Sequence, residues 1–216
     1  MAWTAPRTYA VNEVVTAAIL NGDIRDNLKE TAPFHAAAQG DIFYATAANA
    51  IADLSKGTAV QQLRMVSGAT APEWKGAVAA AASHNAAQTI TTGTTTTLNF
   101  NTENYDTDSI HDTVTDNDRM TAPTIGKYLA IATVEWAANG TGSRYVSIRN
   151  QVPTIISEVW LPNNGGSDVL NMQVACIVNL AANDWVNVRV FQNSGGDLDI
   201  ATSNPLPLFE LVWLGA

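Results

Sequence analysis

Hydrophobic and polar residues alternate along the second half of the chain, from Gln88 onward. In the longest case, Leu170 to Leu180, every second position is apolar. Strand side chains point alternately to the two faces of a sheet, so this period indicates a strand with one face in a core. The same pattern predicts strands over 128–136, 186–190 and 209–213. Weaker patterns predict further strands over 89–92, 95–100, 144–149, 155–161 and 198–201.

Turn-forming residues separate these segments, at 139–140, 163–166, 182–184 and 194–197. About eight to ten strands at such spacing are typical of a β-sandwich or a closed jelly roll. No helical pattern longer than one turn is visible after residue 90. The expected fold class is therefore mainly β: a C-terminal jelly-roll β-sandwich, preceded by a short helix and an extended N-terminal arm.

A helical pattern occurs near the N-terminus. Leu20, Ile24 and Leu28 recur four residues apart, which places them on one face of a helix that Thr16 or Asn12 can cap. A stripe this narrow cannot form a core alone. We expect it to pack on another copy of the chain or on a different protein; the alternative is a small surface helix lying on the domain that follows.

The middle of the chain has no stretch long enough for a core. Residues 40–76 are short apolar pieces separated by Gly, Ala and Thr, with turn-marking glycines. We expect an extended arm whose pieces contact neighbouring chains. Residues 77–87 are Ala-rich and indicate a short helix or a linker. The expected regions are an N-terminal anchor with an amphipathic helix (1–38), an extended shaft or linker (39–87) and a jelly-roll head domain (88–216).

Composition excludes several classes of protein. With 46% hydrophobic and 14% charged residues, the chain is neither disordered nor a coiled-coil rod. Residues 81–216 hold five Lys and Arg against thirteen Asp and Glu, a net of −8 of the chain's −9. This balance argues against nucleic acid or an anionic membrane surface as partner. The start lacks the apolar region of a secretory signal, and no apolar run reaches about 18 residues, so we expect no signal-peptide export and no membrane insertion.

Two stretches resemble phage proteins. The chain opens with AWTAPRTYAVNEVVTAAILNGDIRDNLKE, which resembles the N-terminal segment of many tailed-bacteriophage and prophage structural proteins. It continues with GDIFYATAANAIADLSKGTAVQQLRMVSGATAPEWKG, which is similar to a motif recurrent in phage tail-fibre and appendage proteins. The resemblance covers roughly residues 2–76 and implies a component of a virion, assembled in the host cytoplasm.

The second half resembles a different family. The segments TAPTIGKYLAIATVEW, VLNMQVACIVNLAANDWVNVRV and LFELVWLGA are similar to the trimeric jelly roll of complement globular heads and tumour-necrosis-factor-like domains. In one turn Asn183 stands where that family has glycine, and Asn tolerates positive φ. The resemblance implies a homotrimer with the closing strand at the threefold axis. The expected trimer contacts are Leu20, Ile24, Leu28, Phe209, Leu211 and Trp213.

No catalytic motif is recognisable. None of His35, His84 and His111 belongs to a metal-binding or nucleophile motif, and Cys176, the single cysteine, lies on the inward face of an expected strand. We therefore expect an inert buried thiol, no cofactor and no enzyme activity. Six carboxylates gather in one loop, without the spacing of an EF-hand, and we expect local turns rather than a metal site. They are Glu103, Asp106, Asp108, Asp112, Asp116 and Asp118.

Aromatic residues supply the candidate contacts. Trp185 lies opposite the face of Val186, Val188 and Val190, whereas the pattern leaves the face of Trp160 open; these two are the candidates for stacking on a receptor, such as a host glycan. Trp, Tyr and Arg are enriched at binding hot spots, so the N-terminal residues Trp3, Pro6, Arg7 and Tyr9 are expected to anchor the chain to other virion proteins.

The function expected is that of a virion structural protein, a homotrimeric phage fibre or spike whose head is exposed for host-surface attachment. The alternative is a capsid decoration or head fibre protein with a purely structural role. A glycan-degrading enzyme would need two facing carboxylates in one pocket.

Overall fold

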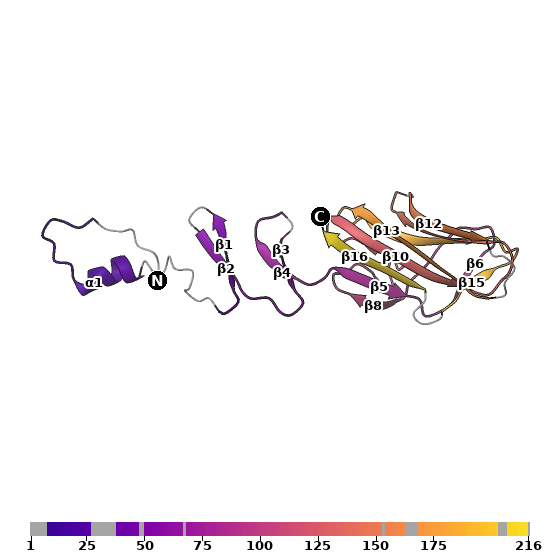
Figure 1. The fold of residues 1–216 in the computed structure, drawn as a ribbon, viewed down its shortest axis with the longest axis horizontal. Coiled ribbons are helices and arrows are strands. Elements are labelled where there is room, and N and C mark those ends of the chain that lie inside the picture. The colour runs from indigo at the N-terminus through magenta and orange to yellow at the C-terminus, as the bar shows by residue number, and fades with distance from the viewer. Residues whose placement is uncertain are drawn as a thin grey trace. The chain divides into compact units, whose positions relative to one another are not determined.

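The computed structural model describes residues 8–26, 38–47, 50–66, 68–152, 154–162, 168–202 and 207–215. Its elements separate into an N-terminal unit, residues 1–76, and a C-terminal unit, residues 77–216 (Figure 1). The division lies at residue 76, ahead of the Ala-rich segment 77–87 that the sequence suggested as a linker.

The N-terminal helix begins where the sequence indicates. Helix α1 (Ala17–Leu20) is capped by Thr16, whose Oγ1 accepts a hydrogen bond from the Ile19 backbone N–H at 3.3 Å. It continues as a π-helical turn, η1 (Asn21–Asp26). Leu20 and Ile24 are 44% and 50% exposed, so no described part of the chain covers these two residues of the expected stripe. Leu28, the third residue of the stripe, lies outside the described residues.

Two antiparallel hairpins occupy the region expected to be an extended arm. Strand β1 (Ile42–Ala47) pairs with β2 (Ala50–Leu54), and β3 (Gln62–Met65) pairs with β4 (Pro72–Lys75). Each first strand follows a turn closed in the same way. The backbone N–H groups of Ala38 and Thr58 donate to the side chains of Asp41 and Gln61, each at 2.7 Å. The hairpins are thus two copies of one local motif.

Trp74 joins the second hairpin to the first. Its indole Nε1 donates to the Ser55 carbonyl at 2.9 Å, and its ring lies directly on Gly57. A Cβ at position 57 would stand 2.6 Å from Trp74 Cδ2, closer than real contacts allow. Glycine is therefore required here by the close approach of the ring rather than by its backbone angles.

The described residues of the N-terminal unit form no core. None of its described residues is buried, and several large apolar side chains are exposed, among them Val14, Ile51 and Leu63. Isolated two-stranded hairpins are at best marginally stable in water. The described part of this unit thus has no buried apolar side chains to stabilise its hairpins.

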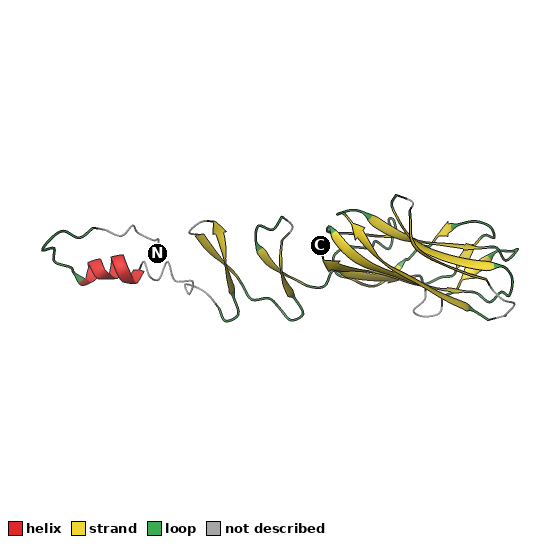
Figure 2. Cartoon of the chain, turned by 45° about the horizontal axis from the view of Figure 1, so that its top comes forward, coloured by secondary structure: helices red, strands yellow, loops and turns green. Residues whose placement is uncertain are grey.

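The C-terminal unit consists of two antiparallel sheets that face each other (Figure 2). The first sheet contains β5 (Ala79–Ser83), β6 (Gln88–Ile90), β8 (Thr102–Asp106), β10 (Gly126–Trp136), β13 (Leu170–Leu180), β15 (Leu198–Ile200) and β16 (Leu208–Gly215). The second contains β7 (Thr96–Thr97), β9 (Arg119–Thr121), β11 (Ser143–Asn150), β12 (Ile155–Pro162) and β14 (Trp185–Gln192).

Strand β10 organises the first sheet. It pairs with β13 along its whole length and with β16 on its other edge, while β11 lies between β12 and β14 in the second sheet. The inward residues of these strands form one continuous core, in which Tyr128, Trp136, Val188 and Ile148 are fully buried. The strands expected from the strong alternation are all present.

Two predictions about this unit need correction. Residues 79–83 form β5, neither a helix nor a linker, and pair with both β16 and β8. The alanines of β5 are nearly inaccessible on both faces, because their small side chains let neighbouring strands pack closely; an all-alanine segment gives no alternation by which to recognise a strand. Phe209 and Leu211, expected at a trimer contact, are fully buried in the core of the sandwich.

The turn before β14 is built as expected. Asn183 has a φ of +70° and occupies the position for which the resemblance gave glycine. Its side chain tolerates this left-handed conformation better than a β-branched residue would.

Candidate binding surfaces

The outer side of the β12–β11–β14 sheet carries an aromatic cluster. Tyr145 on β11 is opposite Trp160 on β12 and Phe191 on β14, and its neighbours Arg144 and Val146 point into the core. The ring centroid of Trp160 lies 5.3 Å from that of Tyr145 and 5.5 Å from that of Phe191. Trp160 therefore leans across the central strand, covers Tyr145 and remains 53% exposed itself.

Trp185 lies toward the other end of the same sheet and is partly covered. The guanidinium of Arg119 sits 5.2 Å from the centroid of its ring, within the range of a cation–π contact. Arg119 also pairs with Asp116. Of the two tryptophans expected to contact a receptor, Trp160 is thus the more available for stacking.

The aromatic partners of Trp160 were not identified from the sequence. Tyr145 and Phe191 occupy positions of opposite parity to the core residues Val146 and Val190. Parity alone therefore places them on the outer face. Their contact with Trp160 depends on strand pairing, which the sequence does not show.

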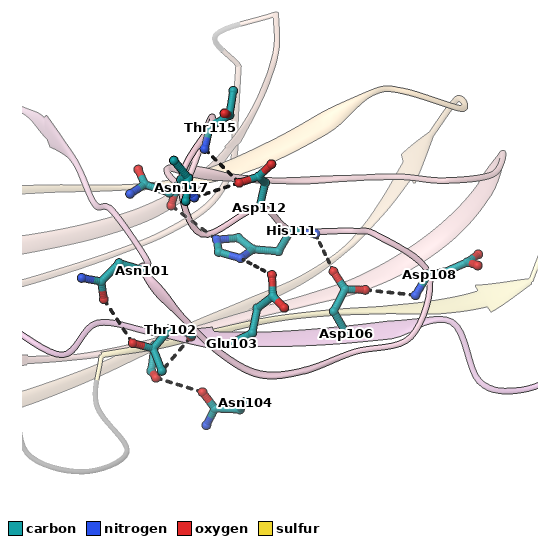
Figure 3. A network of polar contacts seen from close by, with 12 residues as sticks. Asn101, Thr102, Glu103, Asn104, Asp106, Asp108, His111, Asp112, Thr115 and Asn117 are labelled. Atoms are coloured by element: carbon teal, nitrogen blue, oxygen red, sulfur yellow. Dashed lines mark hydrogen bonds and ion pairs between the residues drawn. The ribbon is translucent and has the colours of Figure 1, made fainter.

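The acidic loop is a network of turns (Figure 3). Asp106 accepts hydrogen bonds from the backbone N–H groups of Asp108 and His111 at 3.0 and 2.8 Å. Asp112 accepts from the N–H groups of Val114 and Thr115 at 2.8 and 2.9 Å. These backbone donors hold the pKa of the Asp112 carboxyl below its usual value. Within the described residues no group of three or more His, Cys, Asp or Glu side chains is arranged to hold a metal ion.

His111 supports this loop from inside. Its side chain has no exposed surface; Nδ1 lies 3.4 Å from Glu103 Oε1, and Nε2 lies 3.5 Å from the Asn117 carbonyl oxygen. The buried ring thus links β8 to the loop before β9 and helps to hold that loop in place.

Cys176 is half-buried at the margin of the core, and burial raises the pKa of its thiol, which disfavours the reactive thiolate. His84 directly follows strand β5, and partial burial lowers the pKa of its imidazole. His35 lies outside the described residues.

The expected anchoring residues Trp3, Pro6 and Arg7 lie outside the described residues, while Tyr9 is 42% exposed. On the closing strand, Trp213 packs against the core and donates from Nε1 to the Ile125 carbonyl at 3.2 Å.

The outer side of the first sheet carries an apolar patch among polar residues. Ile177 on β13 and Leu214 on β16 are 62% and 52% exposed, and Leu129 on β10 lies opposite both Ile177 and Val212. If the closing strand contacts another copy of the chain, these outward residues are the ones available. No helix in the described part of the chain has the length and apolar character needed to cross a membrane.

Comparison with known proteins identifies the fold of the C-terminal unit. No protein-family model matches the chain, and no curated protein matches it. Among solved structures, Eiger TNF from S. frugiperda is similar at 14% identity and a TM-score of 0.51, covering 64% of this chain and 93% of that one. Murine APRIL is similar at 12% identity and a TM-score of 0.50, covering 64% of this chain and 99% of that one. The globular domain of zebrafish complement 1qA aligns at 13% identity and a TM-score of 0.47, covering 63% and 97%. The mainly β, jelly-roll fold class is thereby confirmed.

Proposed function

We propose that this chain is a virion structural protein of a tailed bacteriophage, a homotrimeric fibre or spike whose C-terminal head is exposed for attachment to the host surface. The observation that carries this proposal is the lack of buried residues in the described part of 1–76, beside a complete core in 77–216. A segment that buries nothing itself, yet displays apolar side chains, needs partner chains. Its resemblance to phage fibre and appendage segments supports a virion as the place where those partners are found.

Homotrimerisation is supported by the apolar patch on the outer side of the first sheet. Burying a fully exposed isoleucine or leucine contributes about 1.5–3 kcal/mol, so covering Ile177 and Leu214, which expose 62% and 52% of their surface, gains roughly half of that for each. Leu20 and Ile24 offer a second uncovered stripe in the N-terminal unit. Within the described residues of the C-terminal unit, no segment covers Ile177 or Leu214.

Attachment to the particle is assigned to the N-terminal residues Trp3, Pro6, Arg7 and Tyr9, in contact with other virion proteins. The head acts by binding rather than by catalysis, with Trp160 as its foremost exposed aromatic contact. Several heads on one particle would add weak individual contacts through avidity. The place of action is the virion, assembled in the host cytoplasm.

Native mass spectrometry tests the trimer. The full chain should appear at three times 22.9 kDa. Ile177→Asp places three charges at the proposed interface and should give monomers, while Ile155→Asp, an exposed isoleucine of the other sheet, should leave the trimer intact. A wild-type monomer at micromolar concentration would refute the trimer.

Deletion of residues 2–12 tests the anchor. The shortened protein should still form trimers but be missing from purified particles, and particles without it should adsorb poorly to host cells. Normal adsorption of particles that lack the whole protein would favour the structural alternative, a capsid decoration or head fibre. Absence of the full-length protein from particles would refute a virion role altogether.

A further inference from the structure

Basic residues of the C-terminal unit gather on one face. Residues 81–216 contain five Lys and Arg side chains in all. Register places Arg149 opposite Asn187 and Asn187 opposite Arg119, while Arg189 is opposite Ser147, and all these positions alternate with core residues. Three of the five basic residues, Arg119, Arg149 and Arg189, therefore lie on the outer side of the second sheet, in a half of the chain whose net charge is −8.

Two of these arginines lie beside the aromatic cluster. Arg149 extends along β11 toward it, with Nε donating to Ser147 Oγ and Nη2 to Tyr145 Oη, both at 3.4 Å. Arg189 precedes Phe191 by two positions on β14, about 7 Å along the strand. We use the name Trp160 face for the surface formed by Trp160, Tyr145, Phe191, Arg149 and Arg189.

The Trp160 face has unused hydrogen-bonding capacity and a surplus of positive charge. Among the described residues, neither Arg149 nor Arg189 has a carboxylate within 4.0 Å, unlike Arg119 and Arg64. Buried Nε of Arg189 and Oδ1 of Asn187, a residue only 2% exposed, have no hydrogen-bond partner. Glu158 is the single acidic side chain that the three strands place on this side.

We infer that the Trp160 face binds an acidic saccharide, with a sugar ring stacked on Trp160 and its carboxylate held by Arg149 and Arg189. This inference rests on the proposed function and names the class of receptor that the head recognises. Guanidinium groups pair with carboxylates through two parallel hydrogen bonds, and the aromatic ring supplies apolar area at low entropic cost.

Charge complementarity selects this ligand over two others. A neutral glycan would leave both guanidinium groups without a counter-charge. A nucleic acid would bring a row of phosphates against a domain with a net charge of −8, and the basic face is too short to compensate it. A short acidic saccharide can instead pair one carboxylate with Arg149 and Arg189 and carries far fewer charges than a nucleic acid.

Isothermal titration of the full-length protein tests the inference directly. The probes are tetragalacturonate and sialyllactose, each with an uncharged counterpart: the methyl ester of the first, and lactose for the second. At least one acidic probe should bind. The affinity of its uncharged counterpart should be lower by a factor of about 10 or more, and a factor of 10 is equivalent to ~1.4 kcal/mol. Failure of both acidic probes to bind at millimolar concentration, or equal binding of charged and uncharged forms, would overturn the inference.

Variants then locate the site. Arg149→Gln and Arg189→Gln should each lower the affinity for the acidic probe about 10-fold, since each removes a charge-assisted bond. Trp160→Ala should abolish measurable binding. Lys56→Gln removes an exposed positive charge from the N-terminal unit and should change the affinity less than about twofold. An equal loss in Lys56→Gln would indicate long-range attraction only and would contradict a site on the Trp160 face.

Thermal melts of each variant show whether a loss of binding reflects a loss of fold. The comparison between each acidic probe and its uncharged counterpart uses the unaltered protein, so it decides the question even where a variant melts early.

Particle adsorption separates this inference from the proposed function. Virions that incorporate the Trp160→Ala protein at normal copy number but still adsorb fully would overturn the saccharide site and leave the attachment role in place. Acidic-probe binding by a protein that never enters virions would support the site and refute the attachment role.

Discussion

Phe209 offers a direct test of whether the closing strand acts through the core of the head or through a neighbouring copy. Its ring is fully buried on β16, with the centroid 5.4 Å from that of Phe100. On either side β16 pairs with β10 and β5, where Ala132 and Ala82 are opposite Phe209. Neither alanine can expand into the space that a smaller side chain would leave.

Replacement of Phe209 by alanine should therefore be costly. Truncation of a buried phenylalanine destabilises a protein by about 3–5 kcal/mol through lost transfer free energy and the cavity left behind. The lost ring contact with Phe100 adds about 0.5–1.5 kcal/mol. Against a typical stability of about 5–15 kcal/mol, the variant should melt ~10 °C or more below the wild type.

Denaturant titration and thermal melts followed by circular dichroism measure this loss. Val114→Ala, a truncation of a side chain that is 85% exposed, is the control and should stay within about 0.5 kcal/mol of the wild type. Below the melting temperature, native mass spectrometry should still show Phe209→Ala trimers. Two results would show that Phe209 acts at an interface instead: a loss of stability under about 1 kcal/mol, or a folded monomer whose melting temperature equals that of the wild type.

Three further predictions follow from the same structure. A fragment of residues 77–216 should melt cooperatively, whereas one that starts at Ala87 should not, because it lacks β5 between β16 and β8; equal melts of the two would contradict the assigned boundary. Chelator should leave the melting temperature of the full chain unchanged, since Asp106 and Asp112 are occupied with backbone donors; a drop of several degrees would reveal a bound cation. The lowered pKa of Asp112 means that its carboxylate stabilises the folded loop above the usual pKa of an aspartate and loses this effect as the pH falls through the folded-state pKa. Between about pH 5 and pH 3 the melting temperature of Asp112→Asn should therefore fall less steeply than that of the wild type, and parallel curves would exclude this role.

The sequence by itself determined the strands of the head and the faces of their side chains. Alternation over 170–180 and 128–136 is a local property, because a strand with one buried face must repeat every two residues. The same rule placed Val186 and Val188 inside and Trp185 outside. The cap at Thr16 and the positive φ of Asn183 also depend on local backbone chemistry, and both were expected.

Tertiary structure decided what no local pattern contains. The alanines of β5 are buried because β5 is an inner strand, paired with β16 on one edge and β8 on the other. Gly57 lies directly against the ring of Trp74, a contact between two positions that are 17 residues apart. The two arginines of β11 show the same limit. Arg144 points inward, where backbone carbonyl oxygens of Asn139 and Thr141 accept from its guanidinium at 3.1 and 2.9 Å.

Arg149 is five positions further along β11 than Arg144, so its side chain points to the opposite, outer side of the sheet, where it lies beside Tyr145. The period of a strand separates these two arginines onto opposite faces. The residues that pair with them on β12 and β14 are 6 to 48 positions away along the chain. The pairing of such distant segments is set by the packing of the whole domain. The Trp160 face is for this reason a product of register: three strands bring together aromatic and basic residues that the sequence keeps apart.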